Sequence, residues 1–345
     1  MDVTTKPRLA SCWRSDTAPA LGLLLLAPVC GELLTGSTPP PRFFRPAALI
    51  VFLLFYGGGT LLIREARTRW RLQWPVLCLA VAYGIVEEGI MMQSFFSPHH
   101  PDLRVMARYG MYAGVQWPWT LGLLFYHATM STLIPLAVVD LWRPAARERP
   151  WLSAWGIGAA LAGLLVVTVA LMLNVWTQEH GKADPYRPDP LLLGSSVLVV
   201  VGLVGLAYRL RCCVWASDHT RLRSPRTFGL VGFLAQAGNL ILPQAFAGAG
   251  VPALITLVGL LAGLAASLWF LRSQLCHRHA SPAHHVAVVY GSLVFYILLT
   301  PLRDWARVTH HQPFEGMSLV GLGAMILLTL WKRAVARTAG AVGAS

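Results

Sequence analysis

Apolar runs of roughly 18 to 26 residues recur along the whole chain, and each is long enough to cross the ~30 Å hydrocarbon layer of a bilayer as a helix. Hydrophobic residues make up 55% of the sequence and charged residues only 12%, about half the usual charged share of a soluble protein. No aqueous segment is long enough to form a separate soluble domain. The sequence therefore predicts an all-α, polytopic transmembrane helix bundle with one domain, 1–345.

We expect about ten membrane helices. Their predicted ranges are 18–35, 46–63, 72–94, 117–141, 151–176, 190–208, 227–247, 251–271, 285–302 and 314–331. The first range carries Glu32 and follows three basic residues, as does the apolar region of a secretory signal. An uncleaved helix is the favoured interpretation, and a cleaved signal is the alternative.

The basic residues are distributed unevenly between the two sides of the predicted bundle. If ten helices cross, 20 of the 28 Lys and Arg residues fall on the side of the N-terminus. By the positive-inside rule both termini are then cytoplasmic, in a protein of the plasma membrane. The formal net charge of +13 thus reflects topology and attraction to anionic lipid at the cytoplasmic face, and no nucleic acid is expected as a partner. No outer loop contains a cysteine, so no disulfide is expected.

Two adjacent glutamates, Glu87 and Glu88, lie inside the apolar stretch YGIVEEGIMMQSFF. Counted from Leu72, Glu88 is ~24 Å along the helix, about two turns below the outer surface. A carboxylate that faces lipid costs several kcal/mol, so both glutamates should face protein or a water-filled vestibule. Adjacent residues differ by about 100° around a helix, so we expect that the two do not form a close carboxylate pair.

The next predicted helix carries a histidine near the membrane midplane. His127 lies ~15 Å below Trp117. Ser131 shares its face, and Pro135 lacks the N–H that would bind the carbonyl of Ser131. We expect Glu88 above all to share an outward-open polar chamber with His127.

The full set of chamber candidates adds three amides from later helices. The candidates for a solute or ion chamber are Glu87, Glu88, His127, Ser131, Asn174, Gln236 and Asn239. Glu87, Glu88 and His127 are also the candidates for catalysis. The amides and the serine, taken singly, also suit hydrogen bonds between helices, worth under about 1 kcal/mol each. Arg104 and Arg108 in the loop above are competing partners for the glutamates.

No cofactor is identified, and no metal is expected, since the histidines of the loops lack the spacing of a zinc site.

The segments YGIVEEGIMMQSFFSP and VQWPWTLGLLFYHATMSTLIPLAVVDLW resemble a family of uncharacterised prokaryotic polytopic membrane proteins. This resemblance supports the topology but implies no chemistry. Glu87, Glu88 and His127 are also similar, more weakly, to the CAAX-protease and bacteriocin-processing family of glutamic intramembrane proteases. That family has the motifs EExxxR, FxxxH and HxxxN, but here Met92 stands at the arginine and Leu123 at the phenylalanine. No membrane histidine supplies the third motif.

Three classes of function remain open at this stage. The first is a permease-like protein that handles a small ligand or ion through the Glu/His chamber. The second is a glutamic intramembrane hydrolase, and the third is a non-catalytic assembly component. The sequence carries no signal for an oligomeric state.

Overall fold

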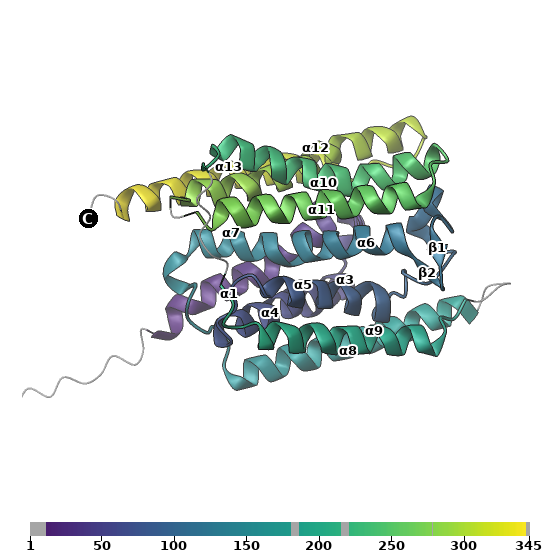
Figure 1. The fold of residues 1–345 in the computed structure, drawn as a ribbon, viewed down its shortest axis with the longest axis horizontal. Coiled ribbons are helices and arrows are strands. Elements are labelled where there is room, and N and C mark those ends of the chain that lie inside the picture. Colours follow the sequence, from purple (N-terminus) through teal and green to yellow (C-terminus); the bar gives the residue numbers. More distant parts are fainter. Residues whose placement is uncertain (1–11, 181–185, 215–220, 278, 343–345) are drawn as a thin grey trace, which may run out of the picture.

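The computed structural model describes residues 12–180, 186–214, 221–277 and 279–342 as a bundle of long helices (Figure 1). The α-helices are α1 (Cys12–Pro28), α2 (Pro40–Phe43), α3 (Pro46–Phe52), α4 (Gly58–Arg69), α5 (Val76–Ile85), α6 (Trp117–Tyr126), α7 (Ile134–Trp142), α8 (Ala154–His180), α9 (Pro190–Arg209), α10 (Pro225–Gly248), α11 (Ala253–Leu275), α12 (Pro282–Thr309) and α13 (Met317–Val342). Strands β1 (Met111–Tyr112) and β2 (Val115–Gln116) form one short antiparallel hairpin. The predicted all-α class is confirmed for the described residues.

Eight continuous helices among the described residues are long and apolar enough to cross a membrane. They are Pro46–Arg69, Trp117–Trp142, Ala154–Gln178, Pro190–Arg209, Pro225–Gly248, Ala253–Leu275, Pro282–Thr309 and Met317–Arg337. A ninth apolar helix, Thr17–Leu33, is shorter. The predicted segment 72–94 is helical only over Val76–Met91, because Gln93 adopts a positive φ of 56° and turns the chain back.

Three of these helices are almost uncovered by the rest of the protein. Only 6% to 11% of the apolar windows of α8, α9 and α11 is buried, and they present leucine and valine side chains outward. In water such a surface would be far larger than the apolar patches of soluble proteins. The lipid bilayer is therefore the environment in which this fold is stable.

The helices run along the long axis of the molecule. The start of α1 and the end of α13 lie at the same end of the bundle, and the β1–β2 hairpin lies at the opposite end (Figure 1). On one side α10 packs against α11 and α12, and α12 packs against α13. On the other side α5 packs against α9, and α4 packs against α8. The continuous helix α6–α7 runs between these two groups (Figure 1).

Four π-helical segments occur in the first four long segments of the bundle. They are η1 (Val29–Leu33), η2 (Leu53–Gly57), η3 (Val86–Met91) and η5 (His127–Leu133). Two of them, η2 and η5, lie within a helix, and two, η1 and η3, lie at a helix end. In each, a backbone N–H donates to the carbonyl five residues earlier, as from Met92 to Glu87 at 2.8 Å. Such segments are rare and occur frequently at functional sites. The chain thus departs from α-helical geometry at four places that prove to lie together.

Proline contributes to the geometry of η5. Pro135 has no N–H, so it leaves carbonyl groups of the preceding turn without their usual donor. The carbonyl of Ser131 instead accepts a hydrogen bond from the hydroxyl of Thr60 at 2.9 Å. This contact joins α4 to η5.

Gly57 allows η2 to lie very close to α1. A Cβ atom at Gly57 would lie 2.5 Å from the backbone oxygen of Leu24, whereas one at Gly58 would have no neighbour closer than 3.8 Å. Small residues permit this kind of close approach between membrane helices. The close contact brings Tyr56 beside Glu32, which lies about two turns beyond Leu24 along the same helical segment.

Candidate functional site

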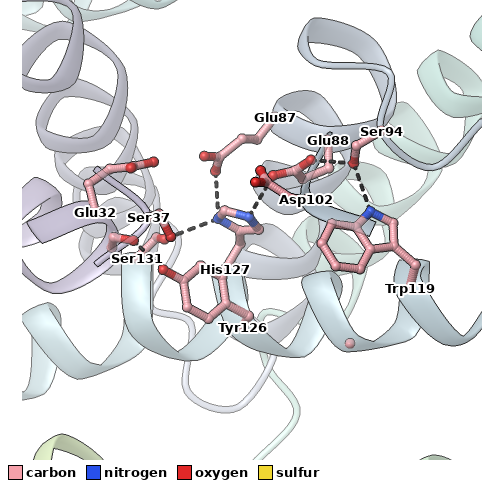
Figure 2. A network of polar contacts seen from close by, with 12 residues as sticks. Glu32, Ser37, Glu87, Glu88, Ser94, Asp102, Trp119, Tyr126, His127 and Ser131 are labelled. Carbon is pink, nitrogen blue, oxygen red and sulfur yellow. Dashed lines mark hydrogen bonds and ion pairs between the residues drawn. The ribbon is translucent and has the colours of Figure 1, made fainter. Parts of the chain in front are cut away.

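His127 is the centre of a buried polar network (Figure 2). Its Nδ1 lies 2.8 Å from Oε2 of Glu87, and its Nε2 lies 3.0 Å from Oε1 of Glu88. The Oγ of Ser131, one turn further along η5, is 3.2 Å from Nδ1. The side chains of His127 and Glu87 are both 3% exposed, and that of Glu88 is 13% exposed.

The expectation that the adjacent glutamates do not form a close pair is wrong. Ligand atoms of Glu87, Glu88 and His127 all lie within 4.8 Å of one another. The imidazole ring presents its two nitrogens in different directions, and the long glutamate side chains reach one nitrogen each. The 100° angle between neighbouring residues therefore separates their Cβ atoms but not their carboxyl groups.

Glu88 is held on its other side by two residues that follow η3 and begin α6. Its Oε2 accepts a hydrogen bond from the hydroxyl of Ser94. The indole N–H of Trp119 donates to the same serine oxygen at 3.2 Å. Ser94 reaches Glu88 because the chain reverses at Gln93. Glu88 therefore joins the turn after η3 to the start of α6.

Glu87 is connected to a third carboxyl group through Tyr56 of η2. The hydroxyl of Tyr56 contacts Oε1 of Glu87 and lies 2.5 Å from Oε1 of Glu32 in η1. Oε2 of Glu32 accepts a hydrogen bond from Thr38 at 2.7 Å. Each of the four π-helical segments thus supplies one or more members of a single network.

Tyr56 lies between two carboxyl groups of the network and can satisfy only one of them as a donor. A phenol has one O–H and donates one hydrogen bond, whereas an ionised carboxylate only accepts. Tyr56 contacts two carboxyl oxygens at hydrogen-bond distance. One contact is donated by Tyr56, so a proton on Glu32 or Glu87 would be needed for the other contact to be a hydrogen bond as well.

The network lies on the wall of a cavity of about 1230 Å³. The cavity extends from His127 to the loop around Pro101 and to the end of α12. The charged and amide side chains that line it are Glu32, Arg42, Glu87, Glu88, Asp102, Arg104, Asn239, Gln244, Arg303, Arg307, Gln312 and Glu315. This volume is large enough for a small organic solute.

Four of the seven predicted chamber residues lie together in the structure. Glu87, Glu88, His127 and Ser131 form the contacts described above. Asn239 lines the same cavity and donates to the carbonyl of Gly122 at 3.0 Å.

The other two predicted amides lie away from the cavity. Gln236 is buried and donates to Thr129 at 3.1 Å, so it joins α10 to η5 as a contact between helices. Asn174 is exposed on α8 and accepts from Gln178 at 2.5 Å. Asn174 lies away from the cavity because α8 is a peripheral helix, most of whose circumference faces away from the bundle.

Sequence reasoning missed several members of the network. Glu32 was recognised as a charge in the first apolar segment but was not assigned to the chamber, and Tyr56, Ser94 and Trp119 were not singled out. Glu32 carried a usable signal, because it too is a carboxylate within an apolar helix. Arg104 and Arg108, the competing partners considered for the glutamates, form no ion pair with them among the described residues.

Spacing alone would permit a metal ion between Glu87, Glu88 and His127. A metal ligand needs a free lone pair on an imidazole nitrogen. Here both nitrogens lie within 3.0 Å of carboxyl oxygens, so a metal ion bound to His127 would have to displace at least one of these contacts.

Apolar helices that enclose a buried network of carboxyl, phenol and imidazole groups define a multi-pass integral membrane protein with an intramembrane polar site. A model described as an uncharacterised membrane protein family matches residues 21–342, and the chain belongs to that family. The predicted resemblance to an uncharacterised polytopic membrane family is thus confirmed. No curated protein and no solved structure matches the chain.

Proposed function

We propose that this protein binds a small polar solute in the cavity and couples its binding or passage to proton transfer, as a proton-coupled permease does. The observation that carries the proposal is the hydroxyl of Tyr56 between the carboxyl groups of Glu32 and Glu87, which links all three glutamates of the network to His127. From there, Glu87, His127 and Glu88 continue a chain of contacts along the cavity wall. Chains of Asp, Glu and His within membrane segments serve as proton relays in pumps and transporters.

The proposed mechanism is a redistribution of protons within the chain of contacts. Groups this close titrate as a unit, so the proton belongs to the network rather than to one residue. A charged or hydrogen-bonding solute beside Glu88 changes which arrangement of protons has the lowest free energy. Hydrogen-bonded neighbours can then pass a proton from one to the next without a large movement of the backbone.

For the topology we propose ten crossings with both termini cytoplasmic, in the plasma membrane. The eight long helices are joined in this scheme by the shorter helices Thr17–Leu33 and Val76–Met91. The common location of the start of α1 and the end of α13 supports an even number of crossings (Figure 1). The cavity then opens outward, and the basic cytoplasmic loops face anionic lipid. Reporter fusions at Arg108 and Arg147 should give opposite locations, and the same location for both would contradict the scheme.

The experiment that tests the proposed function is proton movement across liposomes that contain the purified chain. A pH-sensitive dye is enclosed, and carboxylates, phosphates and amines are added outside one at a time. At least one solute should change the internal pH, and Tyr56→Phe should lower the initial rate at least tenfold. Tyr112→Phe is the matched control, since Tyr112 is 77% exposed. A folded Tyr56→Phe protein with the rate of the unsubstituted chain would contradict the proposal.

The contact of His127 with two glutamates beside a cavity also favours a second candidate, an intramembrane hydrolase. Glu88 and the imidazole are close enough to act together as a general base toward a water molecule. Under this alternative the purified chain cleaves a membrane peptide or lipid ester in detergent, and Glu88→Gln abolishes cleavage. Proton movement without cleavage would leave only the permease-like function.

A further inference from the structure

Arg303, in α12, is a cation on the cavity wall that has no acidic partner in the part of the chain that the structure describes. Its side chain is half-buried and crosses the turn at Gly36, to whose carbonyl Nη1 donates at 3.3 Å. No carboxylate of the described residues lies within ion-pair distance of it. Asp304, the next residue, instead accepts from the backbone and hydroxyl of Ser318 at 2.7 and 2.8 Å. A half-buried guanidinium that has only one long hydrogen bond retains most of its capacity to donate.

The contrast with Arg307, one turn further along α12, is informative. Arg307 also lines the cavity, but it forms an ion pair with Glu315 at 3.2 Å. The other glutamates of the lining, Glu32, Glu87 and Glu88, contact members of the His127 network. Asp102, also in the lining, is largely exposed and lies 4.0 Å from His100. Arg303 therefore has no acidic partner among the described residues.

A second arginine increases the positive charge at this place. Arg104 lines the same cavity, lies near enough to repel Arg303, and has no acidic partner among the described residues. Its backbone has φ 49° and ψ −119°, a conformation that non-glycine residues rarely adopt. Strained residues of this kind cluster at ligand-binding sites. Two neighbouring guanidinium groups on one cavity wall would be stabilised by an anion between them.

We infer that the cavity binds a carboxylate or phosphate group of its ligand at Arg303 and Arg104. The planar guanidinium fork binds both groups through paired hydrogen bonds. An anionic group bound there would place the rest of a small ligand toward the His127 network across the same cavity. The inference rests on the proposed function only in treating this cavity as a ligand site, since it makes no use of proton transfer.

The experiment is equilibrium binding to the full chain in nanodiscs of neutral phosphatidylcholine, measured by thermal unfolding. Inorganic phosphate, acetate and succinate are titrated at constant ionic strength against chloride. At least one should raise the unfolding temperature with a saturable dependence, and Arg303→Gln should weaken its apparent affinity at least tenfold. Arg303→Lys keeps the charge but loses the fork, so it should bind with intermediate affinity. Arg45→Gln is the control, because Arg45 is exposed and lies outside the cavity lining.

A second set of nanodiscs, with phosphatidylglycerol, separates a soluble anion from a lipid headgroup. If the headgroup is the ligand, this lipid stabilises the unsubstituted chain but not Arg303→Gln, and the inferred anion site stands. If Arg303→Gln does not fold, Arg104→Gln replaces it with the same expectation. Binding that is equal in the arginine variants and in the unsubstituted chain would overturn the inference, as would no saturable effect of any anion or lipid. Proton movement is not measured here, so an anion-dependent shift that survives Tyr56→Phe would separate this inference from the proposed function.

Discussion

His127 connects the two halves of the polar network, because its two ring nitrogens contact Glu87 and Glu88. A buried charge that loses its partner costs several kcal/mol, so each member of such a cluster depends on the others. Without the imidazole, two buried carboxyl groups would lose the partner that lies between them. The loss of unfolding free energy on removing one member should therefore depend on whether another member is present.

A double-substitution cycle between Glu88→Gln and His127→Ala tests this dependence. The 3.0 Å contact between Nε2 and Oε1 predicts an interaction free energy of about 1 to 3 kcal/mol, since neighbours in one network are not additive. The measurement is chemical unfolding of the single and double variants in one detergent. His127→Ala with Glu315→Gln serves as the control pair, and it should be additive within about 0.5 kcal/mol. Additivity of that size for Glu88 and His127 would show that the two do not share a site.

At the scale of single residues, the sequence indicated the carboxylates and the histidine but not their partners. Glu87, Glu88 and His127 are recognisable because a charge within an apolar segment is costly and needs an explanation. Tyr56 and Trp119 give no such signal, since tyrosine and tryptophan are common in membrane helices and only their position shows what they bind. Asn174 looked equivalent to Asn239, and only the packing of α8 and α10 distinguishes the two.

The helices reach the site through their π-helical segments. A wider turn rotates and shifts the residues around it, so a π segment changes the direction of side chains, and within η2 and η5 it does so without ending the helix. Hydropathy predicted the helices because a membrane helix must be long and apolar. Hydropathy does not show where a helical turn takes up the extra residue that makes it a π segment. The close approach of Gly57 in η2 to Leu24 is likewise a contact between helices that hydropathy does not reveal.

The paired substitutions Gly57→Ala and Gly58→Ala test how closely η2 must approach α1. At Gly57 a methyl group would lie 2.5 Å from the backbone oxygen of Leu24, so the helices must separate, at a cost of about 1 to 3 kcal/mol. At Gly58 the nearest atom is 3.8 Å away, and alanine should be neutral or stabilising by up to about 1 kcal/mol. Thermal unfolding of both variants gives the comparison. Equal stability of the two variants would count against this close approach as the reason for glycine at position 57.

For the whole molecule, the order of helices along the chain does not give their neighbours. α5 packs against α9, and α6 packs against α10 and α11, although more than a hundred residues separate these partners. Lipid-facing residues look the same in sequence as residues between helices, because both are apolar. The peripheral place of α8, α9 and α11 and the central place of α6–α7 therefore emerge only from the structure.

Accessibility of the cavity from one side of the membrane is the final prediction. Ser37 is exposed and lines the cavity, so Ser37→Cys introduces a thiol there with little change in volume. The native Cys212 and Cys213 are exposed just beyond α9, at the opposite end of the proposed topology. In intact cells a membrane-impermeant maleimide should label Ser37→Cys and leave the unsubstituted chain unlabelled. After permeabilisation both proteins should be labelled, because Cys212 and Cys213 are then reached. Labelling of the unsubstituted chain in intact cells, or of the introduced thiol only after permeabilisation, would reverse the orientation and with it the outward opening of the cavity.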